Sequence, residues 1–335
     1  MSKNSISIFT PFYNPGRFFE ACLNSIINQT FKDWELILID DFSTDESYVL
    51  AEKFSASDPR IKLIKNKEKG LINSLQLGYK YATGAMITRM DADDIMPFDK
   101  LDILHSNLVT KGEGNIAIGC VKYFSEGQLG EGYQFYENWL NNLTELGTSF
   151  EEIYRECVIP SPNFLIFKSD FDKIGGFSAN RYPEDYDLAF RMYQNGLKII
   201  PTDKVTHLWR DHPTRSTRTQ EHYQVLNFIP LKVKYFTEID YNHSKELVLW
   251  GAAKKGKLIA RELIKLNIPF IWACENVQRF GHNVYGNIIQ NASEITHWNS
   301  KQVIIAVSNK FDQIDICERL SQQECPKQTG YYLFF

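Results

Sequence analysis

The sequence predicts an α/β protein with a mostly parallel central sheet, followed by a smaller α/β module. Short apolar runs alternate with segments of helical periodicity, a pattern typical of parallel strands joined by helices. Pro11, Asp41 and Asp91 follow three of these runs. Because the carboxyl ends of parallel strands meet at one sheet edge, where ligands bind, these residues are expected to lie together. A second strand–turn–helix pattern starts near Ser244.

The elements of the first part of the chain follow from local patterns. An apolar run at residues 6–10 predicts a strand, the Asn14-Pro15-Gly16 sequence predicts a turn, and apolar residues in 18–29 recur on one helical face. The same reasoning predicts strands at 34–39, 61–64, 85–90 and 116–124, and helices at 45–54, 70–83, 99–110 and 183–195. In residues 159–167 two prolines are expected to precede a further strand. Residues 127–150 are expected to be loop-rich and aromatic, and residues 207–218 polar and basic.

The remainder of the chain predicts a helical connector at 223–243 and a Rossmann-like α/β module at 244–335, after a main domain at 1–222. Strands are expected at 246–250, 268–273, 302–307 and 331–335, and a helix at 257–266. The turn from Gly251 to Gly256 is a degenerate GxGxxG with Ala253 in place of the middle glycine, and Glu275 follows near the end of the next strand. Because a methyl group at Ala253 would crowd a pyrophosphate, packing or oligomerisation is favoured over nucleotide binding.

Composition narrows the class of protein. The length of 335 residues suits two domains, and the 43% hydrophobic content supports a sizeable core. A net charge of −4 gives no indication of nucleic-acid binding. The six cysteines are widely spaced and form no CxxC pair, so neither a zinc site nor a disulfide framework is indicated. Without a signal peptide or a long apolar run the protein is expected to be cytoplasmic; peripheral contact with the inner face of the membrane and homo-oligomerisation stay open.

The sequence Asp91-Ala92-Asp93-Asp94 points to a metal site. It follows the apolar run 85–90, so its carboxylates would crowd at the end of a buried strand. Carboxylates in such a place are compatible with a divalent cation, and Mg²⁺ and Mn²⁺ take oxygen ligands that they often share with phosphates. The alternative is a helix N-cap, a role that suits Asp94 in particular.

Residues 1 to about 220 resemble a family 2 glycosyltransferase of the GT-A fold. The similarity is carried by ISIFTPFYNPGRFFEACLNSIINQTFKDWELILIDDFSTDES, by MDADD, which resembles the DxD motif of the family, and by YPEDYDLAFR, which resembles its ED motif. The resemblance implies inverting transfer of a sugar from a nucleotide sugar, with a UDP-sugar favoured, to a saccharide or lipid-linked saccharide acceptor. It also implies a role in surface polysaccharide biosynthesis.

The resemblance assigns roles to particular residues. Pro11, Tyr13 and Asp41 correspond to positions that hold the nucleoside base, and Asp91 to a contact with the ribose or sugar of the donor. Asp93 corresponds to the metal ligand and Asp185 to the catalytic base.

Each role has an alternative that depends on the residue's surroundings. Asp185 could instead act with its acidic neighbours Glu184 and Asp187 to complement the helix dipole, and Asp41 could cap a turn. His212 is the favoured histidine ligand of the metal, with His207 as its rival. Arg89 could balance the charge of the acidic tetrad, residues 91–94, or contact the donor. Three arginines of a basic loop could contact the diphosphate or be solvated (Arg210, Arg215, Arg218). Three aromatic residues could line an acceptor site or pack in the core (Tyr133, Tyr136, Trp139).

The leading hypothesis is therefore a metal-dependent, inverting glycosyltransferase that uses a nucleotide sugar with Mn²⁺ or Mg²⁺. A nucleotidyltransferase is the first alternative, although the loop at 11–17 is poor in the glycines expected of that class. A non-catalytic sugar-nucleotide-binding scaffold is the second, and the presence of both Asp93 and Asp185 argues against it.

Overall fold

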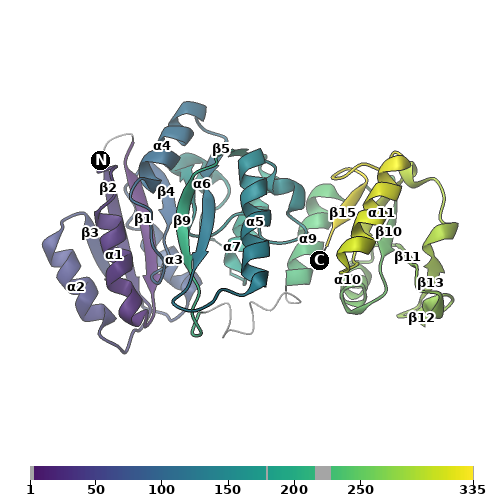
Figure 1. Ribbon diagram of the computed structural model, residues 1–335, viewed down its shortest axis with the longest axis horizontal. Helices are drawn as coiled ribbons and strands as arrows, with labels where there is room; N and C mark the ends of the chain where they lie inside the picture. The colour runs from purple at the N-terminus through teal and green to yellow at the C-terminus, as the bar shows by residue number, and fades with distance from the viewer. Residues whose placement is uncertain (1–3, 179, 216–227, 335) are drawn as a thin grey trace. The chain divides into compact units, whose positions relative to one another are not determined.

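The computed structural model describes residues 4–178, 180–215 and 228–334, and Figure 1 shows their helices and strands. The described residues form two compact units. The first contains residues 4–149 and the described residues of 158–215, and the second contains Phe150–Cys157 together with residues 228–334. Arg218 and the start of the expected connecting helix lie outside the described residues.

The first unit is built on a seven-stranded sheet that is mostly parallel, as predicted. Only β7 runs antiparallel to its neighbours β4 and β5. In order across the sheet, the strands are β3 (Ile61–Lys65), β2 (Trp34–Asp40), β1 (Ile6–Phe12), β4 (Met86–Arg89), β7 (Phe164–Phe167), β5 (Asn115–Ile118) and β8 (Lys198–Ile200). A separate parallel pair joins β6 (Cys120–Phe124) to β9 (Val205–Arg210).

Helices pack against both faces of this sheet. Strand β2 is buried along its whole length, as expected of a central parallel strand. On one face Ile8 and Leu36 belong to the same apolar cluster as residues of α1 and α4. On the other face α3 approaches so closely that a Cβ at Gly78 would lie 2.8 Å from Ile39 Cδ1. The helices of this unit are η1 (Gly16–Phe18), α1 (Phe19–Ile27), α2 (Ser47–Ser57), α3 (Leu71–Tyr79), α4 (Lys100–Lys111), α5 (Glu131–Leu146), α6 (Lys168–Lys173) and α7 (Glu184–Gln194).

Two expectations for the first unit were wrong. Residues 127–150 are not mainly loop, because Glu131–Leu146 forms the 16-residue helix α5, which ends at Gly147 in the left-handed conformation. The expected strand at 116–124 is two strands in different sheets, β5 and β6. They separate at Gly119, where a Cβ would lie 1.9 Å from Thr206 Oγ1. The polar segment that begins at His207 continues β9 as far as Arg210.

The second unit contains a six-stranded sheet in which only β12 is antiparallel. Phe150–Cys157, which includes part of η2 (Ser149–Glu152), packs in this unit: the Tyr154 ring stacks on Phe334 at 5.1 Å, and its hydroxyl donates to Asp240. The strands in order are β12 (Asn283–Val284), β13 (Asn287–Asn291), β11 (Ile271–Cys274), β10 (Glu246–Trp250), β14 (Lys301–Ile305) and β15 (Tyr331–Leu333). The helices are α9 (Ile229–Tyr235), η5 (Phe236–Asp240), α10 (Lys254–Lys265), η6 (Val277–Arg279), η7 (Ala292–Glu294), η8 (Trp298–Ser300) and α11 (Lys310–Gln322).

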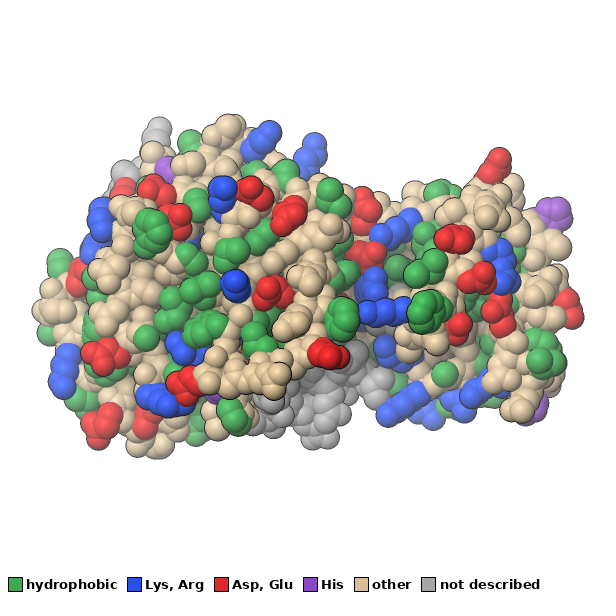
Figure 2. Space-filling model, viewed as in Figure 1, with side chains coloured by type: hydrophobic (Ala, Val, Ile, Leu, Met, Phe, Trp, Pro, Cys, Tyr) green, Lys and Arg blue, Asp and Glu red, His purple; other side chains and the backbone are tan. Residues whose placement is uncertain are grey.

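The surface of the first unit carries charges of both signs. On the face shown in Figure 2, acidic and basic side chains are interspersed over this unit, in keeping with the net charge of −4. None of the helices among the described residues has the length and apolarity needed to cross a bilayer.

Candidate active site

The structure brings the predicted strand-end residues to one edge of the seven-stranded sheet. Pro11 is the last but one residue of β1, Asp41 follows β2 directly, and Arg89 ends β4. The register of the parallel strands pairs Phe12 with Asp40 and Phe9 with Arg89, so the carboxyl ends of β1, β2 and β4 lie next to one another. The edge predicted from three separate sequence positions is therefore present.

Asp41 is buried and faces the loop between β3 and α3. Its Oδ1 accepts hydrogen bonds from Asn66 Nδ2 at 2.8 Å and from the Gly70 N–H at 2.9 Å. The turn cap considered as its alternative role is made by the neighbouring residue, because Asp40 Oδ1 accepts the N–H of Ser43. Gly70 adopts a φ of +135°, which favours glycine at this contact.

Tyr13 offers an exposed aromatic face beside Asp41's loop. It is 50% exposed, and Lys69 Nζ lies 4.2 Å from the centre of its ring. The combination of an aromatic face, a cation and a carboxylate suits a nucleotide base next to phosphate. Sequence reasoning missed Asn66 and Lys69, although the lysine-rich stretch that ends at Gly70 was a visible signal.

Two carboxylates of the acidic tetrad, Asp93 and Asp94, contact β9 and the segment after it. Asp93 Oδ2 is hydrogen-bonded to His212 Nε2 at 2.8 Å. Asp94 is 1% exposed, and it accepts from the Arg210 N–H at 2.8 Å and is hydrogen-bonded to His207 Nε2 at 2.9 Å. The two rival histidines therefore contact different carboxylates. The N-cap expected of Asp94 is wrong, because α4 begins only at Lys100.

The pKa values of Asp93 and Asp94 are shifted in opposite directions. Burial, followed by the charges of Asp93 and Asp91, raises the pKa of Asp94 well above its ordinary value. Burial acts in the same direction on Asp93, but the His212 hydrogen bond and the charge of Arg215 hold the pKa of Asp93 below its ordinary value. Asp93 is thus the carboxylate of the pair that stays ionised most readily.

The Asp93–His212 pair fits a divalent cation. Adjacent ligands of an octahedral Mg²⁺ lie about 3 Å apart, close to the separation of these two atoms. Within the described part of the chain, no group of three or more His, Cys, Asp or Glu side chains is arranged to hold a metal. An ion at this pair would therefore need water and ligand oxygens to complete its coordination.

The first turn of α7 separates its three acidic residues into different contacts. Glu184 is buried and accepts from Arg89 Nη1 at 3.0 Å, and Asp187 pairs with Arg191 at 2.9 Å. Among the described residues, Asp185 accepts one hydrogen bond, from the Tyr186 N–H at 2.7 Å. Burial, together with the charge of Glu184, raises the pKa of Asp185 to about 7.

Arg89 and Tyr182 connect the three predicted motifs. Arg89 forms ion pairs with Asp91 at 2.9 Å and with Glu184 at 3.0 Å, so it joins the tetrad to the start of α7. Tyr182 lies beside the Asp41 contact, because a Cβ at Gly70 would be 3.9 Å from the Tyr182 hydroxyl oxygen and the Gly70 N–H donates to Asp41. Burial and then the charge of Glu184 raise the pKa of Tyr182. The geometry supports the charge-balancing role of Arg89, and a contact of Arg89 with the donor stays a prediction.

The remaining predicted residues are two arginines and three aromatic side chains, and their contacts are as follows. Arg210 Nε donates to the Asp93 carbonyl, so this arginine holds the tetrad. The buried guanidinium of Arg215 lies 4.8 Å from the centre of the Trp209 ring, and the negative charge of Asp94 raises the pKa of Arg215 against the effect of burial. The three aromatic residues considered for an acceptor site lie on α5, where Tyr133 packs against Tyr123 and Tyr136 against Trp139.

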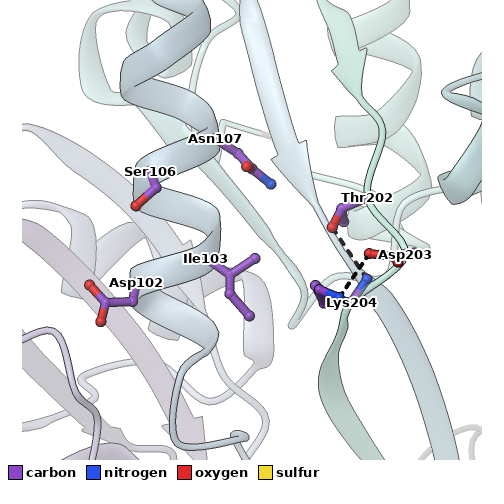
Figure 3. Close-up of a pocket in the computed structure, with 7 residues that line it drawn as sticks. All are labelled: Asp102, Ile103, Ser106, Asn107, Thr202, Asp203 and Lys204. Atoms are coloured by element: carbon purple, nitrogen blue, oxygen red, sulfur yellow. Dashed lines mark hydrogen bonds and ion pairs between the residues drawn. The ribbon is translucent and has the colours of Figure 1, made fainter.

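A hollow of about 400 Å³ in the first unit lies apart from these residues. Figure 3 shows Ile103 and Asn107 pointing from α4 toward the segment Thr202–Lys204, while Asp102 points away. Asp203 and Lys204 form an ion pair at 3.4 Å beside it. Because its walls contain none of the predicted site residues, we place the candidate active site at the strand ends.

The chain is similar in sequence to known glycosyltransferases. The model of the family described as "Glycosyl transferase family 2" matches residues 7–175. An Escherichia coli UDP-Glc:alpha-D-GlcNAc-diphosphoundecaprenol beta-1,3-glucosyltransferase, WfgD, is 37% identical over 235 residues, which cover 56% of this chain and 92% of the relative. The chain spans 73% of the length of GlyG and 30% of that of GlyA, two glycosyltransferases of Streptococcus pneumoniae.

Solved structures share the fold at low sequence identity. Staphylococcus aureus TarS 1-349 in complex with UDP-GlcNAc is 17% identical with a TM-score of 0.55, and the match covers 77% of this chain and 71% of that one. A Pyrobaculum calidifontis mannosyltransferase in complex with GDP-Man and Mn²⁺ is 18% identical with a TM-score of 0.51, covering 79% and 70%. The predicted fold, a GT-A domain with an additional C-terminal domain, is confirmed.

Proposed function

The chain belongs to glycosyl transferase family 2, and we propose on that basis that it transfers a sugar from a UDP-sugar, with inversion, to a saccharide or lipid-linked saccharide acceptor. The observation that carries the proposal is the pair of ion pairs made by Arg89. They hold the Asp91–Asp94 tetrad and the start of α7 together at the sheet edge that also carries Asp41. A donor and a catalytic carboxylate would thereby share one site.

The nucleoside of the donor would bind at Pro11, Tyr13 and Asp41. The exposed ring of Tyr13 would pack against the base, and the buried Asp41 carboxylate would accept the imide N–H of a uracil. A UDP donor is also supported by two proteins similar to this chain. WfgD is described as a glucosyltransferase that uses UDP-Glc, and TarS is solved in complex with UDP-GlcNAc. Lys69, held against Tyr13, would add positive charge near the phosphates.

Asp93 and His212 would hold Mn²⁺ or Mg²⁺. When bound, such an ion would stabilise the charge that develops on the leaving nucleotide diphosphate. The mannosyltransferase that shares this fold is solved with Mn²⁺, which supports the assignment. Asp91 would contact the ribose or sugar of the donor, while Arg89 fixes the orientation of its carboxylate.

Asp185 would act as the general base. An acceptor hydroxyl is a weak nucleophile, so a carboxylate must take its proton as the hydroxyl attacks the anomeric carbon. Glu184 and Asp187 are engaged with arginines, whereas the Asp185 carboxylate accepts one backbone N–H among the described residues. Its raised pKa makes it a stronger base than an ordinary aspartate.

The acceptor would be a saccharide of a surface polysaccharide pathway, built at the cytoplasmic face of the membrane. WfgD acts on a sugar linked to diphosphoundecaprenol, which supports a lipid-linked acceptor. The partly exposed aromatic residues Tyr133, Tyr136 and Trp139 of α5 would offer flat faces to the acceptor sugar.

A donor screen tests this function. Purified protein is incubated with Mn²⁺ and UDP-, GDP- or dTDP-sugars, with and without a pool of lipid-linked and free saccharides, and nucleotide release and product are measured. We expect acceptor-dependent release of UDP from one UDP-sugar. Binding of donors without turnover would overturn the enzyme assignment in favour of a scaffold. Release of pyrophosphate from a nucleoside triphosphate and a sugar phosphate would indicate a nucleotidyltransferase.

A further inference from the structure

The second unit contains a hollow of about 320 Å³ at the carboxyl ends of its parallel strands. Its walls come from four segments: the turn after β10 (Trp250–Ala253), the end of β11 with the residues that follow (Cys274–Asn276 and Arg279), the segment after β14 (Ala306–Asn309) and the first half of α11 (Asp312 and Ile316). All of these residues belong to the second unit, and none of them is a residue of the candidate active site.

The position of the hollow in the sheet is one where ligands bind in open α/β folds. From β10 the chain proceeds through α10 to β11 on one side, whereas β14 lies on the other side of β10 and leads through α11 to β15. The strand order therefore reverses between β10 and β14. Such a reversal leaves a crevice between the two strand-to-helix turns.

The turn after β10 is tightly packed and lies beside a positive charge. Gly251 has a φ of +128°, and a Cβ at Gly256 would lie 2.0 Å from the Gly251 carbonyl oxygen, so the first turn of α10 lies directly against the strand end. Ala253 is the N-cap of α10 and has no side-chain acceptor for the free N–H groups there. Arg279 Nη1 donates to the Ala252 carbonyl, which holds a guanidinium at the same turn.

The rest of the wall contains polar residues on both sides and apolar residues on the β14 side. Glu275 follows β11, in the place where a carboxylate accepts ribose hydroxyls in related folds, and it is held by Arg319 at 2.7 Å. On the β14 side the apolar residues Ala306, Val307 and Ile316 line the hollow together with the polar residues Ser308, Asn309 and Asp312. The volume is at the lower end of the range for small-molecule sites, which suits one nucleotide and not two.

We propose that this hollow binds a nucleoside 5′-monophosphate. The phosphate would lie against Arg279 and the start of α10, the ribose against Glu275, and the base over the apolar residues Ala306 and Val307. A single phosphate also avoids the crowding that the methyl group of Ala253 imposes on a pyrophosphate. The sequence alone favoured a packing role for this module, and the hollow with its charged wall is what changes that interpretation.

Calorimetric titration of the full chain tests the proposal. AMP, GMP, CMP and UMP are titrated separately into the wild-type protein and into four variants. Arg279→Ala removes the guanidinium, and Ser308→Trp fills the hollow from an exposed position of its rim. Arg261→Ala is the matched control, since this exposed arginine of α10 lies over the Tyr285 ring and does not line the hollow. Asp93→Ala impairs the proposed transfer site.

We expect at least one monophosphate to bind the wild-type protein with a Kd below about 1 mM. Arg279→Ala and Ser308→Trp should each weaken that binding by at least about tenfold, while Arg261→Ala and Asp93→Ala leave it unchanged. Transfer activity should stay unchanged in Arg279→Ala and Ser308→Trp. The proposal is overturned if no monophosphate binds, if binding survives both variants of the hollow, or if Asp93→Ala abolishes it. Binding of NAD⁺ at least about tenfold tighter than any monophosphate would overturn the single-nucleotide assignment.

Discussion

Both units place the carboxyl ends of parallel strands at a sheet edge, yet the turns after β2 and β4 differ in charge from the turn after β10. In the first unit β2 leads into Asp41, and β4 leads into the Asp91–Asp94 tetrad, whose carboxylates have arginine and histidine partners. In the second unit β10 leads into the uncharged turn Gly251–Ala253, with Arg279 beside it. The comparison teaches that the sheet determines the position of a candidate site, whereas the residues after the strands determine the charge of that site.

The largest expected effect is the loss of transfer on removal of the carboxylate proposed as the base. Asp185→Asn should lower kcat by about 10³-fold, because the amide cannot accept the proton of the acceptor hydroxyl. Donor affinity should change little, since Asp185 lies outside the residues proposed to hold the nucleotide. Acceptor-dependent UDP release measures kcat, and calorimetry measures donor binding.

Asp187→Asn is the control for this substitution. It removes a charge from the same helical turn, but its partner is Arg191, and a role limited to the helix dipole would make the two variants alike. We expect Asp187→Asn to retain most of its turnover per folded molecule. Near-normal turnover of Asp185→Asn would refute the assignment of the base.

His212 and His207 have different carboxylate partners, so their substitution should have different effects. His212→Ala should reduce the affinity for Mn²⁺ by about 10- to 100-fold, because it removes one of two proposed protein ligands. Activity should recover in part at higher Mn²⁺, and chelation should abolish it. His207→Ala should instead lower the melting temperature, since it leaves the buried Asp94 without one of its partners. An unchanged Mn²⁺ requirement in His212→Ala would exclude this residue as a ligand.

The pH dependence of transfer tests the environment of Asp185. Its pKa is raised to about 7, and the base must be ionised to act, so the active fraction falls as the pH drops through that value. We expect kcat/KM at saturating Mn²⁺ to decrease about tenfold per pH unit below pH 7. A profile that stays flat to about pH 5 would show that Asp185 has an ordinary aspartate pKa or is not the base.

The candidate site could be predicted from sequence where short segments decide the chemistry. The tetrad and Asp41 follow buried apolar runs, and the acidic first turn of α7 follows Pro183, so their place at strand or helix ends could be predicted locally. The pairing of the histidines could not. His212 and His207 lie 119 and 113 residues from their carboxylate partners, and their partners depend on where β9 crosses the tetrad.

Sequence reasoning failed where packing decides the structure. Helix α5 buries only Leu140, Leu143 and Thr144, a narrow apolar stripe that local periodicity did not separate from a loop. The hollow in the second unit depends on how closely α10 approaches Gly251, a distance that the degenerate glycine motif alone does not determine. The motif therefore predicted a turn and a helix, but the hollow beside them could be found only in the structure.

The close packing in the second unit gives the smallest expected effect. Gly256→Ala should destabilise the protein by about 1–3 kcal/mol, because the added Cβ would lie 2.0 Å from the Gly251 carbonyl and must displace a backbone atom. The matched control is Gly132→Ala on α5, where no heavy atom lies within 4 Å and alanine should stabilise the helix by about 0.5–1 kcal/mol. Urea denaturation followed by circular dichroism measures both. Equal stabilisation by the two substitutions would mean that the turn after β10 yields easily, and a turn that yields could not hold the fixed wall that the proposed nucleotide site requires.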